Sequence, residues 1–291
     1  MDIDNLKAFI HVTEQGSFSR AAETLFITQP AVSKRVANLE SQLGTTLFDR
    51  IGHSIILTES GQALLPRARR ILLELKDCQR VVANLNESIK GPVMIGTSHH
   101  IGLHRLPPVL RKFTREFPDV QLNIQFMDSE EACHAVMQGD IEIGIVTLPL
   151  SPHPELKLIN IWHDPLVLVA PKGHALTKQK TVQLQALATH NAILPATGTF
   201  TREVLERTLA PLSIELQVGM STNYLETIKM LVSVGLGWSI LPKAMLDNDV
   251  CELKNSTIKM ERNLGIVTHT QRTQSNAAGA LISTLEKFRE K

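Results

Sequence analysis

The chain has 291 residues, a formal net charge of +1 and 43% hydrophobic residues. This length permits two domains with substantial apolar cores. It lacks an apolar run near the roughly 20 residues that a membrane helix needs, so we expect no membrane partner. The charge excludes nucleic-acid binding by a bulk positive excess, because residues 1–90 carry eleven Lys and Arg against ten Asp and Glu. A nucleic acid must instead be bound by a few Lys and Arg side chains at specific positions and by the backbone N–H groups of helix N-termini.

The N-terminus and the cysteines indicate a reducing compartment. The chain opens with MDIDNLKAFI, which is acidic and amphipathic and lacks the basic start and apolar stretch of a secretory signal. Cys78, Cys133 and Cys251 are scattered and odd in number, unlike a disulfide framework. We therefore expect a cytoplasmic protein.

Residues 17–50 are typical of two helices joined by a tight turn at Ile27-Thr28. Pro30 then falls in the first turn of the second helix, where proline is tolerated. The apolar positions recur at helical spacing: Ala21, Ala22 and Leu25 in the first helix, and Val32, Val36, Leu39 and Leu43 in the second.

The outer face of the second helix carries Gln29, Ser33, Lys34 and Arg35. Gln can bond an adenine edge at two atoms, Ser is adaptable, and Lys or Arg can reach guanine or phosphate. This set is typical of a DNA recognition helix. Two amphipathic helices joined by a short turn are also common as packing units, so periodicity alone leaves a purely structural role open.

The order of the residues is more specific than their spacing. The chain resembles the N-terminal domain of the LysR-type transcriptional regulators nearly position for position, over AAETLFITQPAVSKRVANLESQLGTTLFDR and LTESG. The resemblance implies a winged helix-turn-helix over residues 1–58, with the wing between residues 47–50 and 55–58 and a turn at Gly52. The DNA contacts that we expect are Ser19, Thr28, Gln29, Pro30, Ser33, Lys34, Arg35, Arg50 and His53.

A long amphipathic helix is predicted over residues 59–90, with Thr58 as its N-cap and Gly91-Pro92 after its end. Charged residues flank a heptad seam, as expected for a helix that pairs with another helix. A helix packed on its own domain is the alternative, but the seam lies between two domains, and the resemblance also implies a linker that pairs two subunits. We expect Cys78 to be a small buried hydrophobic residue on this seam. The seam consists of Leu64, Ala68, Ile71, Leu75, Cys78, Val82 and Leu85.

Strand-like runs alternate with helical stretches beyond this helix, which favours a parallel sheet with helices on both faces. The predicted strands are 93–96, 120–126, 141–146, 166–170, 193–194 and 238–241, and the predicted helices are 106–117, 130–138, 201–209 and 224–234.

Three pieces, RKFTREFPDVQLNIQF, GDIEIGIV and GLGWSILPKAML, resemble the effector-binding domain of the same family. The resemblance implies an α/β domain over residues 91–291, built like a periplasmic binding protein, with a cleft between two lobes. We place lobe I at about 92–161 plus 266–291, and lobe II at about 162–265.

Polar loops after predicted strands indicate where the cleft lies, because ligands of open parallel sheets bind beyond strand C-termini. Their hydroxyls and backbone N–H groups suit an anion, although a single Ser or Thr there is more often a helix cap. The loops at 97–98, 147 and 199–201 hold no acidic residue, so we expect a small carboxylate or other anion. The effector contacts that we expect are Thr97, Ser98, His99, His100, Thr147, Thr199, Thr201 and Thr222.

His99, His100 and His104 are the most tempting metal candidates, with His100 and His104 four positions apart. A metal site needs further ligands at one point, and neither a Cys nor a carboxylate lies beside them in the sequence. The family usually reads small organic molecules. We therefore expect no metal ligand and no cofactor, and favour a neutral His that hydrogen-bonds an effector.

Two other protein classes are disfavoured. An enzyme is disfavoured because the sequence lacks a Gly-rich phosphate loop, a G-x-S-x-G elbow and an HExxH motif. A transport receptor would lack residues 1–90 and would carry a signal peptide. We predict a LysR-type regulator that binds double-stranded DNA as a homodimer, assembled further into a homotetramer, and changes its DNA contacts when a small effector binds. RNA polymerase stays an open partner, as do the effector's identity, the target genes and the sign of regulation.

Overall fold

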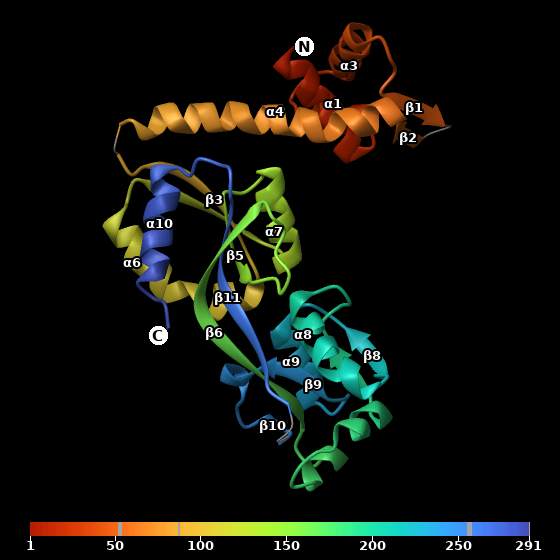
Figure 1. Cartoon of the computed structure of the whole chain (residues 1–291), viewed down its shortest axis with the longest axis vertical. Coiled ribbons are helices and arrows are strands. Elements are labelled where there is room, and N and C mark those ends of the chain that lie inside the picture. Colours follow the sequence, from red (N-terminus) through yellow and green to blue (C-terminus); the bar gives the residue numbers. More distant parts are fainter. Residues whose placement is uncertain (52–53, 87, 255–257, 291) are drawn as a thin grey trace. The chain divides into compact units, whose positions relative to one another are not determined.

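The protein is described by a computed structural model that covers residues 1–51, 54–86, 88–254 and 258–290 (Figure 1). The chain forms two compact units, Met1–Leu85 and Asn86–Lys291. Within the described residues, no helix is both long and apolar enough to span a bilayer.

The first unit is a winged helix-turn-helix, which confirms the predicted fold of the N-terminus. Its elements are α1 (Ile3–Gln15), α2 (Phe18–Thr24), α3 (Gln29–Leu43) and the antiparallel strands β1 (Phe48–Ile51) and β2 (Ser54–Leu57). The turn between α2 and α3 contains Phe26, whose φ is 54°. Gly44 ends α3 at φ 68°, a left-handed conformation that glycine adopts without steric cost.

The core of this unit forms where the apolar faces of α1, α2 and α3 meet the wing. Phe48 of β1 packs on Phe9 and Phe18, with ring centroids 5.4 and 5.9 Å apart. Ala21 is fully buried, and its small side chain allows α2 to approach the other helices closely. Because Val32, Val36 and Leu39 are buried in the same core, the opposite face of α3 is turned outward.

The long helix α4 (Glu59–Asn84) begins where predicted, because the Thr58 hydroxyl accepts a hydrogen bond from the Gly61 N–H at 3.0 Å. It ends earlier than predicted. Leu85 follows as its C-cap, and Gly91-Pro92 already belongs to the first strand of the second unit.

The second unit is built on a seven-stranded sheet of order β10-β6-β11-β5-β3-β4, with β9 paired to β6. A separate parallel pair is formed by β7 and β8. The strands are β3 (Gly91–Thr97), β4 (Val120–Phe126), β5 (Ile143–Thr147), β6 (Leu156–Pro171), β7 (Ala192–Leu194), β8 (Val218–Ser221), β9 (Ser239–Pro242), β10 (Val250–Glu252) and β11 (Met260–His269).

The prediction of a parallel sheet is wrong for part of this unit. Strands β3, β4 and β5 run parallel, but β6 and β11 pair antiparallel with each other. The reason is topological. Strand β6 leads out of the first lobe, which contains β3, β4 and β5, and β11 returns to it, so the two strands run in opposite directions (Figure 1).

Helices cover the sheet and flank both lobes. They are α5 (His99–His104), α6 (Leu106–Glu116), α7 (Ser129–Gln138), α8 (Phe200–Leu209), α9 (Leu225–Ser233) and α10 (Asn276–Glu286), with the short 3-10 turns η1 (Ala175–Lys178), η2 (Leu184–Thr189), η3 (Ala210–Leu212) and η4 (Lys243–Met245).

The two long strands β6 and β11 connect separate apolar cores. On β6, Trp162 belongs to the core of the first lobe and Leu166 to that of the second. On β11, Met260 belongs to the core of the second lobe and Leu264 to that of the first. Gly265 follows with a bulge, where a Cβ would lie 2.1 Å from a backbone oxygen of β6.

A buried ion pair lies at this crossing. Asp164 and Arg262 are register partners on β6 and β11, and the Arg262 Nε donates to Asp164 Oδ2 at 2.8 Å. Their side chains are 1% and 5% exposed. Burial lowers the pKa of Arg262, and the nearby Asp164 opposes that shift. Arg105 approaches the other carboxylate oxygen at 3.6 Å. The pair thus ties the two crossing strands at the point where the lobes meet.

We expect Asp164→Leu to lower the free energy of unfolding by about 3–5 kcal/mol, because it leaves the Arg262 charge buried without its partner. The double variant Asp164→Leu/Arg262→Met should recover most of that loss, since neither charge is then buried. Denaturant titration followed by tryptophan fluorescence measures both, because Trp162 and Trp238 lie in this unit. A double variant no more stable than the single one contradicts this account.

Candidate DNA-binding and effector sites

The outward face of α3 carries the predicted DNA contacts. Gln29 donates from Nε2 to the Ser33 hydroxyl at 2.9 Å, so the two side chains lie together one turn apart. Thr28 precedes the helix without capping it through its side chain. The exposed predicted residues are Ser19, Thr28, Gln29, Pro30 and Lys34, while Ser33 is half-buried.

Arg35 differs from the prediction. Its Nη2 lies 3.0 Å from Asp4 Oδ2 and its side chain is 30% exposed, so it ties α3 to the start of α1. Sequence spacing placed it on the outer face, but the neighbouring helix supplies a carboxylate there. The side chain of Arg50 and the whole of His53 lie outside the described part of the chain, so their contacts stay predictions.

The predicted seam of α4 divides into two halves. Ala68 is fully buried in the core of its own unit, and Leu64 packs against the same core, so the prediction that they contact a second subunit is corrected. Further along, Ile71, Val82 and Leu85 are 41%, 66% and 78% exposed. Leu75 is half-buried. Cys78 is exposed, not buried as predicted.

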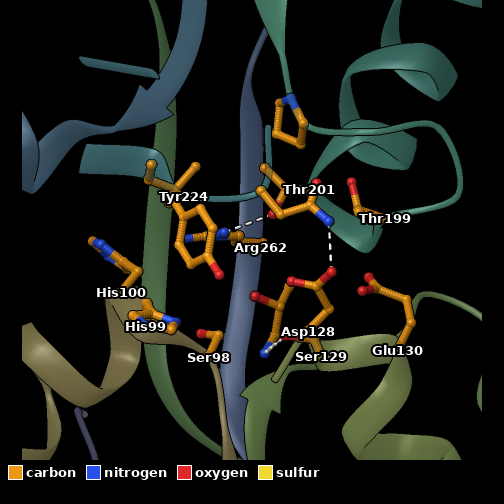
Figure 2. A pocket seen from close by; sticks show the side chains of 14 residues that line it. Ser98, His99, His100, Asp128, Ser129, Glu130, Thr199, Thr201, Tyr224 and Arg262 are labelled. Atoms are coloured by element: carbon orange, nitrogen blue, oxygen red, sulfur yellow. Dashed lines mark hydrogen bonds between the residues drawn. The ribbon is translucent and has the colours of Figure 1, made fainter. Parts of the chain in front are cut away.

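A cleft lies between the two lobes, at the carboxyl ends of β3, β4 and β5 (Figure 2). Six of the predicted effector contacts line it: Ser98, His99, His100, Thr147, Thr199 and Thr201. Two do not. Thr97 is fully buried and donates to the backbone oxygen of Ile145 at 2.7 Å, and the Thr222 hydroxyl accepts from the Tyr224 N–H within a turn.

The predicted contacts leave out the other lining residues, although the sequence also places the polar loop 221–224, with Asn223 and Tyr224, at the cleft. The residues left out are Asp128, Ser129, Glu130, Pro195, Asn223, Tyr224, Leu225 and Arg262. Residues 128–130 follow the predicted strand 120–126, so the rule of polar loops after strands would have found them. Arg262 follows no such rule, because it lies within a strand that the sequence analysis did not predict.

Arg262 is the buried cation at this cleft. Its Nη1 donates to the Thr201 hydroxyl at 2.6 Å (Figure 2). Its Nη2 is buried and has no hydrogen-bond partner among the described residues. An unpaired buried donor costs free energy, and a ligand oxygen would remove that cost.

Two carboxylates also line the cleft, and both are already engaged across it. Asp128 accepts a hydrogen bond from the Asn223 amide at 2.5 Å (Figure 2). Glu130 accepts one from the backbone N–H of Phe200. Burial raises the pKa of Glu130, and the bond from Phe200 opposes the shift. Each of these acids of the first lobe therefore uses one oxygen to contact the second lobe.

Histidines form one end of the cleft. The His99 ring lies between Phe126 and Tyr224, at centroid distances of 4.9 and 4.7 Å. His100 Nδ1 and His104 Nε2 lie 3.4 and 3.0 Å from Glu226 Oε1. Burial lowers the pKa of His100, while the nearby His100 holds the pKa of Glu226 down to about 2.

Known proteins share both units of this chain. A family model of the bacterial regulatory helix-turn-helix protein, lysR family, matches residues 3–62, and one of the LysR substrate binding domain matches residues 86–289. An uncharacterized HTH-type transcriptional regulator, YfeR of Shigella flexneri, is 30% identical over 96% of this chain and 91% of its own.

Solved structures agree on the fold. Full-length CbnR complexed with its target DNA matches with a TM-score of 0.64 and 22% identity, over 99% of this chain and 100% of its own. The effector-binding domain of QuiR in complex with shikimate matches with a TM-score of 0.63 and 19% identity, over 69% of this chain and 97% of its own. These relatives are regulators rather than enzymes, and the chain belongs to the LysR family of transcriptional regulators.

Proposed function

We propose that this regulator binds its operator as a homo-oligomer, reads bases through α3, and changes its DNA contacts when a small anion binds between the lobes. The unpaired Nη2 of Arg262 at the cleft carries the effector part of this proposal. A contact with RNA polymerase stays a prediction.

The exposed face of α3 supports base reading. Its other face is occupied by the domain core, and Gln29, Ser33 and Lys34 are among the polar side chains outside that core that can meet a groove. CbnR, which shares the fold, has been crystallised with its target DNA. Because the chain has little net charge, its affinity for DNA must come from individual side-chain and backbone contacts and from several DNA-binding domains of one oligomer binding together.

Gln29→Ala should weaken binding to the specific operator by about 1–3 kcal/mol and leave binding to random DNA nearly unchanged. The operator is first selected from a random library, and fluorescence anisotropy at fixed salt then compares both DNAs. Gln62→Ala on α4 is the matched control, since it removes an exposed glutamine outside α3. Equal losses on both DNAs would exclude base reading by Gln29.

The second half of α4 supports oligomerisation. Ile71, Val82 and Leu85 are exposed at heptad positions of the seam, with the exposed Val81 beside them, and large exposed apolar side chains in a row are typical of an interface. We propose that Ile71, Leu75, Val82 and Leu85 pair with the same residues of a second chain. Further pairing of dimers would give the homotetramer.

Val82→Glu should dissociate the oligomer, because it places two like charges opposite each other in an apolar seam. Ala83→Glu adds the same charge to the neighbouring exposed position and should have little effect. Sedimentation velocity measures the species present. An unchanged sedimentation coefficient for Val82→Glu would show that the seam does not join subunits.

An anion fits the remaining donors of the cleft. Ser98 precedes α5 without capping it through its side chain, so its hydroxyl is free for a ligand, and Arg262 Nη2 adds a charged donor. Thr199 is less available, because its hydroxyl donates to Ala196 and accepts from Arg202 in capping α8. The related QuiR domain holds a small molecule, shikimate.

Ser98→Ala should lower effector affinity at least ten-fold, since a hydrogen bond to a charged acceptor contributes about 1.5–3 kcal/mol. Thermal-shift screening of small carboxylates with the full chain finds the ligand, and calorimetric titration then compares the variants. Ser233→Ala, at the end of α9 and outside the cleft lining, is the control. A ligand that is neutral or cationic would contradict the proposed effector class.

A further inference from the structure

Three side chains at the end of the cleft converge on one point. His100 and His104 lie one turn apart on α5, and Glu226 lies in the first turn of α9. One nitrogen of each histidine and one carboxylate oxygen all lie within 4.8 Å of one another. The sequence offers the two histidines without a third ligand, and the fold brings Glu226 to them.

We propose that His100, His104 and Glu226 bind a divalent transition-metal ion, with Zn²⁺ as the best match. Two imidazoles and one carboxylate are a donor set that Zn²⁺ accepts, and three protein ligands leave a fourth position open. The site needs neither DNA nor an effector to bind the ion, although His100 also lines the effector cleft.

Two of the three spacings between the ligand atoms match a tetrahedral ion. Ligands at about 2.0–2.1 Å from a tetrahedral centre lie roughly 3.3 Å from each other. Glu226 Oε1 lies 3.0 Å from His104 Nε2 and 3.4 Å from His100 Nδ1. The third spacing, between the two histidine nitrogens, is within 4.8 Å, and the His104 side chain, which is 49% exposed, would turn to shorten it.

His100 supplies an independent observation. Its side chain is 6% exposed, and its Nδ1 is buried without a hydrogen-bond partner among the described residues. The Glu226 carboxylate lies 3.4 Å from this nitrogen, an ion-pair contact that lacks the geometry of a hydrogen bond. A buried polar atom left in this state costs free energy, and a bound cation would use its lone pair.

Ordinary surface pairs in this chain differ from this cluster. His163 lies 3.3 Å from Glu261 and His153 lies 3.7 Å from Glu155. In both pairs a single histidine meets one carboxylate, and both side chains are about half exposed. The cluster at Glu226 has a second histidine and a buried nitrogen, which an ion pair alone does not require.

A metal ion here would tie the lobes together. His100 also lines the effector cleft, and α5 follows a strand of the first lobe, whereas α9 packs on β9 in the second. An ion held by both helices would favour the arrangement in which the lobes stay close.

Competition between the full chain and a chromophoric chelator for Zn²⁺ tests the site. The chelator-treated wild type should bind one equivalent, and His104→Gln and Glu226→Gln should each bind it at least ten-fold more weakly. His163→Gln removes a comparable exposed histidine beside a glutamate and should bind like the wild type. Co²⁺ in place of Zn²⁺ should give the visible absorption of a tetrahedral site in the wild type and in His163→Gln, but not in His104→Gln or Glu226→Gln.

Equal affinity of the wild type and the two ligand variants for Zn²⁺ overturns the proposal. A loss in His163→Gln as large as that in His104→Gln also overturns it. Because His104 is 49% exposed, its replacement leaves the core intact, and the affinity then reports on the site itself. The measurement involves neither DNA nor effector, so its outcome is distinct from that of the proposed function.

Discussion

The effector-binding unit depends on one interaction, the buried pair of Asp164 and Arg262. Two charges removed from water cost several kcal/mol each unless each satisfies the other, so the pair forms only in one register of β6 and β11. That register sets the point along both strands at which their apolar residues stop contributing to the core of one lobe and begin contributing to the core of the other. It also fixes Arg262 so that one nitrogen donates to Thr201 and another remains unpaired at the cleft.

Other contacts between the lobes follow from this crossing. Asp128 accepts a hydrogen bond from the Asn223 amide, and Glu130 accepts one from the backbone N–H of Phe200. Glu226 forms ion pairs with the histidines of α5. In the first two cases a carboxylate of the first lobe has its charge engaged by a donor of the second. The cleft is therefore bordered by acids that each accept a hydrogen bond from the second lobe and by an arginine whose Nη2 has no hydrogen-bond partner among the described residues.

Local patterns predicted much of the secondary structure. The strand at 120–126 and the helix beginning at Leu106 were found because their apolar residues recur at the right period. Strand β11 was missed because it contains charged residues, among them Arg262, and charged residues in a sequence are ordinarily assigned to the surface. The antiparallel course of β6 was missed because strand direction depends on the path of the chain between lobes.

The sequence by itself determined the family, the helix-turn-helix and the loops that follow strands. Each of these features depends on the type and spacing of residues that are close together in the sequence. Tertiary structure alone decided which distant residues meet. Arg262 reaches Asp164 across 98 positions, and His104 reaches Glu226 across 122. Those meetings depend on strand register and on the packing of two lobes, and no local propensity encodes either. Packing within the first unit likewise buried Ala68 in that unit's core, although its heptad position had placed it at a subunit interface.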